Sequence, residues 1–217
     1  MTWNPESLSD PQSLSPDQGI TQSLPVHALP VQPESATLPA AILRPTAIVL
    51  TGSILAAVCA HVSVPLFFTP VPLSLAPFAV LLLGLLLSPR LAAATFVTYL
   101  AEGAVGLPVF APSPLSGIAH LFGPTGGYLL AYPVAAFLIS ILYRRTQRAF
   151  VAAALTTAAG SFVILASGAL WLAALSHASL QSVFTLAVLP FLPGDALKIA
   201  AAAALGTGFI RLRRQIS

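Results

Sequence analysis

From about residue 45 to residue 210 the chain consists of apolar segments separated by short connections, and this alternation limits the folds available to it. The six segments cover 45–64, 72–88, 91–107, 126–143, 149–176 and 183–210. A helix needs about 20 apolar residues to cross a bilayer, and fewer where the bilayer is thin or other helices bury the segment. We therefore predict an all-α membrane protein, a bundle of six transmembrane helices.

The composition agrees with a membrane location. Hydrophobic residues make up 57% of the chain and charged residues only 7%, whereas a soluble domain carries roughly a quarter charged residues. Long runs of Ala, Leu and Val, broken by Pro and Gly, are typical of helices. An outer-membrane barrel would show short alternating segments instead.

The first 38 residues have a different character. They are rich in Ser, Pro and Gln and hold four of the six acidic residues. They lack the basic stretch and apolar core of a signal peptide. Too few apolar residues are present to form a packed core. We predict a disordered tail over 1–38 and a membrane domain over 39–217.

The basic residues indicate the orientation of the bundle. The arginines all lie before the first segment, in alternate connections or after the last segment: Arg44, Arg90, Arg144, Arg145, Arg148, Arg211, Arg213 and Arg214. The other connections, near 65–71, 108–125 and 177–182, contain no Lys or Arg. Positively charged loops face the cytoplasm, so both termini are predicted to be cytoplasmic. Short basic runs next to a membrane ordinarily bind anionic lipid, and we expect no nucleic-acid partner.

The stretch "LPFLPGDALK" (189–198) places an acid and a base in apolar surroundings. Pro190 and Pro193 interrupt helical hydrogen bonding, so a new helix is expected to begin near Asp195. The carboxylate would then cap the free N–H groups of that helix. Lys198 is three residues further on, so both side chains point the same way.

An Asp195–Lys198 ion pair could simply stabilise a broken helix. However, a charge inside a bilayer costs at least about 2.5 kcal/mol, and buried pairs rarely recover their desolvation energy. We therefore predict that the pair is functional. Glu102 is the other candidate intramembrane charge, and its role stays open.

Other irregular stretches collect at the same face and would form the walls of a pocket. The connection 106–130 supplies Phe110 and Tyr128, and Gly126 and Gly127 leave backbone open to approach. Trp171 lies in the outer part of the fifth segment. We predict an outward-opening, aromatic-walled pocket for a small amphipathic molecule.

The sequence carries little sign of metal or catalytic chemistry. His61 and His120 lie near outer loop ends, where placement at the membrane interface is the usual explanation, and two distant histidines are a poor zinc signal. Ser and Thr show no nucleophile–base spacing. We predict no metal, no cofactor, no catalytic residues and no enzymatic activity.

Small residues form a stripe on the first segment. Gly52, Ala56 and Ala60 recur every four residues, which allows close approach of another helix. The stripe could pack inside the bundle or dock a partner protein.

Four stretches carry a resemblance to a known family: "TPVPLSLAPFAVLLLG" (69–84), "YLAEGAVGLPVF" (99–110), "GPTGGYLLAYPVAAF" (123–137) and "LPFLPGDALK". In this order and spacing they resemble the BioY family, the substrate-binding S components of biotin transporters of the energy-coupling factor (ECF) type. The resemblance covers about 45–214. It implies a six-helix protein that captures biotin from outside.

The resemblance also implies partners: a membrane coupling protein and two cytoplasmic ATPases. The chain itself has no Gly-x-x-x-x-Gly-Lys-Ser/Thr loop. In this family the stripe of the first helix faces the coupling protein, which favours the docking role for Gly52, Ala56 and Ala60. Some members lack dedicated partners, so a solitary or homo-oligomeric form stays open.

Biotin would suit the predicted pocket, because its ureido ring has two N–H donors and one carbonyl acceptor. Asp195 would accept from a ureido N–H. Lys198 would donate to the ureido oxygen or, as an alternative, pair with the valerate carboxylate. The substrate-binding residues predicted on this basis are Asp195, Lys198, Tyr128, Gly126, Gly127, Thr125, Trp171 and Phe110.

The chain departs from the family pattern in three places. Ala76 and Pro77 stand where Gln and Thr are frequent, "APSPLSGIAH" (111–120) replaces a glycine-rich loop, and Glu102 replaces a residue that is usually apolar. Two alternatives remain: an S component for another small vitamin, and an intramembrane enzyme that uses Asp195 and Lys198 as acid and base.

Overall fold

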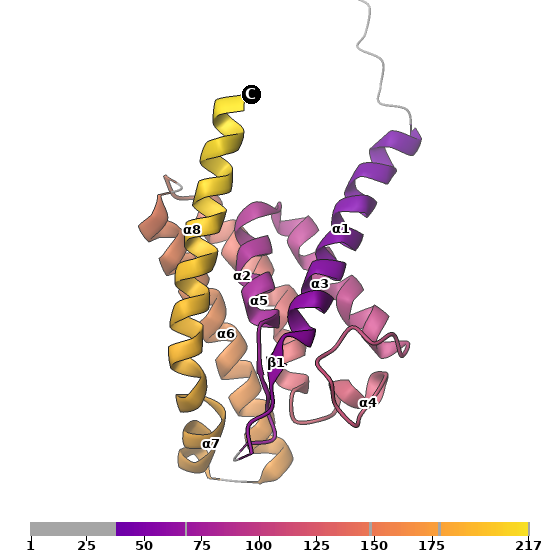
Figure 1. Ribbon diagram of the computed structural model, residues 1–217, viewed down its shortest axis with the longest axis vertical. Helices are drawn as coiled ribbons and strands as arrows, with labels where there is room; N and C mark the ends of the chain where they lie inside the picture. The colour runs from indigo at the N-terminus through magenta and orange to yellow at the C-terminus, as the bar shows by residue number, and fades with distance from the viewer. Residues whose placement is uncertain (1–37, 68, 148, 178, 217) are drawn as a thin grey trace, which may run out of the picture. The chain divides into compact units, whose positions relative to one another are not determined.

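The computed structural model describes residues 38–67, 69–147, 149–177 and 179–216. The tail predicted over 1–38 lies outside these residues except for Leu38. Most of the described chain is helical (Figure 1). The elements in chain order are α1 Leu38–His61, β1 Ser63–Val64, β2 Leu73–Ser74, α2 Ala76–Leu86, α3 Pro89–Ala104, α4 Ile118–Leu121, α5 Gly126–Arg144, α6 Phe150–Ser176, α7 Leu180–Ala187, the 3₁₀ turn η1 Leu189–Phe191 and α8 Leu192–Ile216.

Among the described residues, four stretches are helical, long and apolar enough to cross a membrane. They are Ile42–His61, Gly126–Arg144, Phe150–Ser176 and Gln181–Leu212, the last of which joins α7 to α8. Helices α2 and α3 are shorter, with 11 and 16 residues. The chain is therefore a helical membrane protein with several spans.

Helix α5 is the centre of the bundle. It packs against α2, α3 and α6, whereas α1 packs on α2 and α3, and α8 on α2 and α6. In the apolar part of α5, 61% of residues are buried. The corresponding fractions are 22% in α1, 28% in α6 and 25% in the span that joins α7 to α8. Helices α1 and α8 therefore form the flanks, as Figure 1 shows.

The centre is closely packed because small residues surround one branched side chain. Gly84 of α2 and Gly160 of α6 both lie directly against Ile139 of α5. A Cβ at position 84 would come within 2.9 Å of the Ile139 Cβ. Three helices thus approach one another around Ile139, and a larger residue at either glycine would push them apart.

The two ends of the bundle differ. The start of α1 and the end of α8 lie at one end, and the β1–β2 hairpin, α4 and α7 lie at the other (Figure 1). The hairpin is antiparallel, with Ser63 opposite Ser74 and Val64 opposite Leu73. The described residues of the connections that lack Lys and Arg, at 65–67, 69–71, 108–125, 177 and 179–182, lie at the hairpin end.

Some predicted boundaries were wrong. Helix α1 begins at Leu38 rather than 45, so Arg44 and Pro45 lie inside it. It ends at His61 rather than 64 because the next residues pair with β2 as a strand. The break in the sixth segment is confirmed, and α8 starts at Leu192, with Pro193 in the first turn, where no helical hydrogen bond needs its nitrogen.

The small-residue stripe of α1 faces the bundle. Ala56 and Ala60 are 0% and 1% exposed, and Gly52 lies directly against Thr95 of α3. The single chain thus places the stripe in internal packing, and the docking role expected for Gly52, Ala56 and Ala60 stays a prediction.

Candidate functional site: a cavity with a buried ion pair

A cavity of about 220 Å³ lies among the residues of the hairpin end. Its walls come from the α1–α2 hairpin segment, the connection between α3 and α5, and helices α3, α5, α6 and α8. Segments far apart in sequence therefore meet around one space. Most of the lining is apolar, and a few polar groups are placed within it, which is the usual composition of a small-molecule site.

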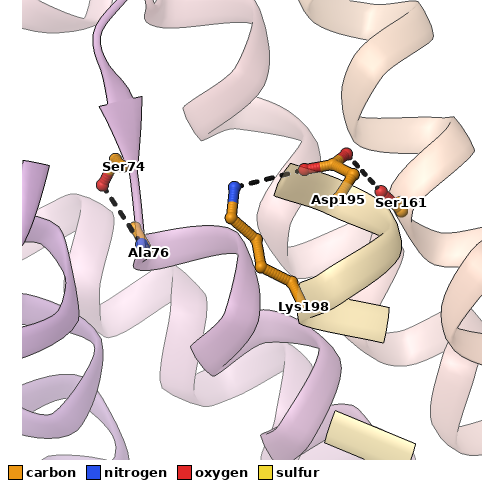
Figure 2. Close-up of polar contacts among 5 residues, drawn as sticks. All are labelled: Ser74, Ala76, Ser161, Asp195 and Lys198. Atoms are coloured by element: carbon orange, nitrogen blue, oxygen red, sulfur yellow. Dashed lines mark hydrogen bonds and ion pairs between the residues drawn. The ribbon is translucent and has the colours of Figure 1, made fainter. Parts of the chain in front are cut away.

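Asp195 and Lys198 line this cavity as one pair. Lys198 Nζ lies 3.2 Å from Asp195 Oδ1, and the two residues are 6% and 8% exposed. The other carboxylate oxygen, Oδ2, accepts a hydrogen bond of 2.6 Å from Ser161 Oγ of α6. Figure 2 shows the carboxylate between the ammonium and the serine. Three buried polar groups from two helices therefore hold one another in place.

The carboxylate does not cap α8, which corrects that expectation. The helix starts at Leu192, so Asp195 is already its fourth residue, although still in the first turn. The hydrogen bonds of its oxygens go to side chains, Ser161 and Lys198. The carboxylate still lies near the positive end of the helix dipole.

The opposite wall is the end of the hairpin. Ser74 Oγ accepts from the Ala76 N–H over 3.1 Å and donates to the Ala60 carbonyl over 3.4 Å. These bonds join β2 to the start of α2 and the end of α1. Figure 2 shows the Lys198 ammonium reaching from α8 toward this wall. A ligand headgroup in the cavity would therefore meet both partners of the ion pair on one side.

Aromatic rings form much of the remaining wall. Tyr99, Tyr128, Tyr132 and Phe191 line the cavity. The Tyr128 and Phe191 rings are 6.4 Å apart, and the Tyr99 hydroxyl donates to the Val109 carbonyl over 3.2 Å. Rings fixed in this way offer flat apolar surfaces to a bound heterocycle.

The predicted site residues divide into two groups. Asp195, Lys198, Tyr128 and Thr125 line the cavity. Gly126, Gly127, Trp171 and Phe110 are not among the lining residues, and their contact with a ligand stays a prediction.

These four residues pack against one another or, in the case of Phe110, against lining residues. Gly127 lies against Trp171, whose Nε1 donates to the Gly123 carbonyl over 2.9 Å. This contact fastens the start of α5 to α6. Phe110 is 7% exposed, with ring centroids 5.3 Å from Tyr99 and 4.8 Å from His120.

Sequence reasoning missed two polar residues of the site. Ser161 lies 34 positions before Asp195, on a different helix. His120 was expected at the membrane interface, but it is 5% exposed and lines the cavity. Its Nδ1 lies 3.1 Å from the Leu115 carbonyl. No local pattern marks either residue, because each acquires its role from a contact made by the folded chain.

Within the described residues, no group of three or more His, Cys, Asp or Glu side chains could hold a metal ion. The site instead offers one carboxylate acceptor and one ammonium donor in an aromatic surround. That combination suits reversible recognition of a neutral polar group that both donates and accepts hydrogen bonds.

A membrane-embedded helical bundle with a polar-floored cavity at one end is a small-molecule binding protein of the membrane. The chain belongs to the BioY family, whose model matches residues 31–215.

Relatives agree with that assignment. A probable biotin transporter BioY of Pyrococcus horikoshii is 41% identical over 61% of this chain and 76% of its own length. Biotin transporter BioY of Thermotoga maritima is 33% identical over 78% of this chain and 91% of its own. The crystal structure of an S component for biotin from an ECF-type ABC transporter has a similar fold, with a TM-score of 0.71, 24% identity, and coverage of 79% of this chain and 92% of that one.

Proposed function

We propose that this chain captures biotin and takes part in its uptake across the cell membrane as the S component of an ECF-type transporter. Membership of the BioY family and the names of the relatives support the substrate. The observation that carries the proposal within the structure is the buried Asp195–Lys198 pair on the cavity wall. The chain acts as a binding subunit and not as an enzyme.

The pair matches the ureido group of biotin. A ureido N–H donates to Asp195, whose Oδ1 faces Lys198, and the ureido oxygen accepts from the ammonium. Because a charged partner roughly doubles the strength of a hydrogen bond, these two contacts would carry much of the affinity. Tyr128 and Phe191 would lie against the bicyclic ring. Thr125 would form part of the cavity wall near the start of α5.

We further propose that α2 and α3 complete six spans with both termini in the cytoplasm. The arginine-free connections gather at the end that holds the cavity, whereas Arg90 lies at the start of α3 and Arg144 and Arg145 at the end of α5, helix ends on the opposite side of the bundle. By the positive-inside rule the cavity then faces outward. A cavity at the outer face could take biotin directly from outside the cell.

The proposed partners are a membrane coupling protein and two cytoplasmic ATPases, because the likeness is to an S component of an ECF-type transporter. Docking of the coupling protein on the stripe Gly52, Ala56 and Ala60 is part of this proposal, and it would require α1 to move relative to α3, because Gly52 lies against Thr95. A solitary or homo-oligomeric form is the alternative, and co-purification with a tagged coupling protein would separate the two.

The decisive experiment is equilibrium binding of labelled biotin to the purified full chain in detergent. We expect saturable, tight binding that excess unlabelled biotin abolishes, with the ligand recovered chemically unchanged. Competition by a different vitamin, but not by biotin, would assign the site to that vitamin. Recovery of an altered ligand would overturn the binding-subunit proposal.

A further inference from the structure

The ion pair of the cavity has no net charge, so it does not balance the negative charge of an anionic ligand. Among the described lining residues, Asp195, Lys198 and His120 can carry a charge near neutral pH. Asp195 and Lys198 neutralise each other over 3.2 Å. A ligand that carries a carboxylate, as biotin does, would therefore bring one uncompensated negative charge into a largely apolar space, which is costly. The remaining group that could balance it is His120.

The position of His120 fits that role. It belongs to α4, which packs against α3 and α5, whereas the helix of the ion pair, α8, packs against α2 and α6. Figure 1 shows α4 and the start of α8 on opposite sides of the β1–β2 hairpin. The cavity reaches residues of both. A ligand with a polar ring at one end and a carboxylate on a flexible chain at the other could contact both sides at once.

The ring orientation of His120 is also fixed. Its Nδ1 lies 3.1 Å from the Leu115 carbonyl, and a carbonyl can only accept, so Nδ1 carries the hydrogen. The Phe110 ring packs against the imidazole at 4.8 Å. Nε2 is thus left as the nitrogen that can meet a ligand. A protonated ring would offer Nε2–H, which is the donor that a carboxylate needs.

The surrounding loop offers no competing donor of the same strength. The stretch that lines the cavity before α4 runs from Ala111 to Leu115 and includes Pro112 and Pro114, and prolines have no backbone N–H. His120 is the residue of this wall that can become a cation.

We propose that His120 is the carboxylate-recognising residue of the cavity, so that the site selects ligands with a free acid at the end opposite the ion pair. The proposal rests on biotin being the ligand, and it divides the site into two ends. Asp195 and Lys198 bind the ureido ring, and His120 binds the valerate carboxylate.

The test compares biotin with biotin methyl ester, which keeps the ring and removes the negative charge. Both affinities are measured on the full chain in detergent, for the wild type, His120→Leu and His120→Gln. We expect the wild type to prefer the acid by about tenfold, as the loss of one charge-assisted hydrogen bond predicts. His120→Leu should bind both ligands equally, through weaker binding of the acid and unchanged binding of the ester. His120→Gln keeps an N–H donor without the charge and should retain part of the preference.

Two control variants make the result specific. The double variant Asp195→Asn, Lys198→Met should weaken acid and ester by the same factor, because it changes the ring end without leaving an unpaired charge. An equal loss of both ligands in His120→Leu would reduce His120 to a structural residue and overturn the proposal. Loss of the acid preference in Lys198→Met, with the preference intact in His120→Leu, would assign the carboxylate to Lys198 and would also overturn it. A wild type that binds neither ligand would instead refute the biotin assignment itself.

Discussion

The two carboxylates near the hairpin end, Asp195 and Glu102, have opposite surroundings. Asp195 is 6% exposed, lies beside an ammonium and lines the cavity. Glu102 is half-buried on α3, and one of its oxygens, Oε2, accepts a hydrogen bond from Ser53 Oγ of α1. It borders a groove whose other lining residues are apolar except for His61. Asp195 thus lies beside a cation in a cavity, whereas Glu102 lies beside a hydroxyl group in an open groove.

This difference separates an acid that belongs to a binding site, Asp195, from an acid that the fold only tolerates, Glu102. The Asp195 carboxylate is held by two buried partners, so its direction is fixed before a ligand arrives, which reduces the cost of binding. A half-buried acid such as Glu102 can keep part of its hydration, and its removal would leave no buried charge unpaired. Substitutions at the two acids should therefore have very different effects on biotin affinity.

The largest effect is expected from breaking the ion pair. Asp195→Ala and Lys198→Met should each weaken biotin binding by more than tenfold, because each variant removes a ligand contact and leaves a buried charge without its partner. Equilibrium binding in detergent measures this directly. Glu102→Gln is the matched control and should stay within about twofold of the wild type. Wild-type affinity in both pair variants would refute the site.

An intermediate effect is expected from Ser161, which positions Asp195 and is not assigned a ligand contact. Ser161→Ala should weaken biotin binding by about three- to tenfold, since it removes one hydrogen bond to a charged group. Ser161→Thr keeps the hydroxyl and should restore most of the affinity.

The control for this prediction is Ser167→Ala on the same helix. Ser167 Oγ donates to the Gly127 carbonyl over 2.8 Å, so its hydrogen bond is directed away from the Asp195 carboxylate. Equal effects of Ser161→Ala and Ser167→Ala would mean that both serines act only through helix packing, and the positioning role of Ser161 would be lost.

The smallest effect is expected at the second acid. The double variant Ser53→Ala, Glu102→Leu removes donor and acceptor together, and such replacements are often neutral or stabilising in apolar surroundings. Biotin affinity should stay within about twofold, and the thermal midpoint, followed by circular dichroism, should be unchanged or raised. A more than fivefold loss of affinity would show that Glu102 acts on the cavity, and the contrast between the two acids would fail.

Local patterns predicted those parts of the site that depend on neighbours in sequence. The three-residue spacing of Asp195 and Lys198 was enough to predict one pair, because helix geometry alone brings them together. Aromatic and glycine residues near 106–130 predicted the wall in outline, but not which ring faces the ligand. Trp171 and Phe110 are not among the lining residues and pack against Gly127 and Tyr99, so their contact with a ligand stays a prediction.

The sequence by itself determined that the chain lies in a membrane, that its sixth segment is broken and a helix restarts near Asp195, and that one acid and one base share a face of that helix. These follow from hydropathy, from proline chemistry and from helical periodicity, which are local properties. Only the tertiary structure decided that Ser161 holds the carboxylate, that His120 turns into the cavity and that the α1 stripe faces inward. Those three facts depend on which helices pack together, and packing is set by the shapes of distant surfaces.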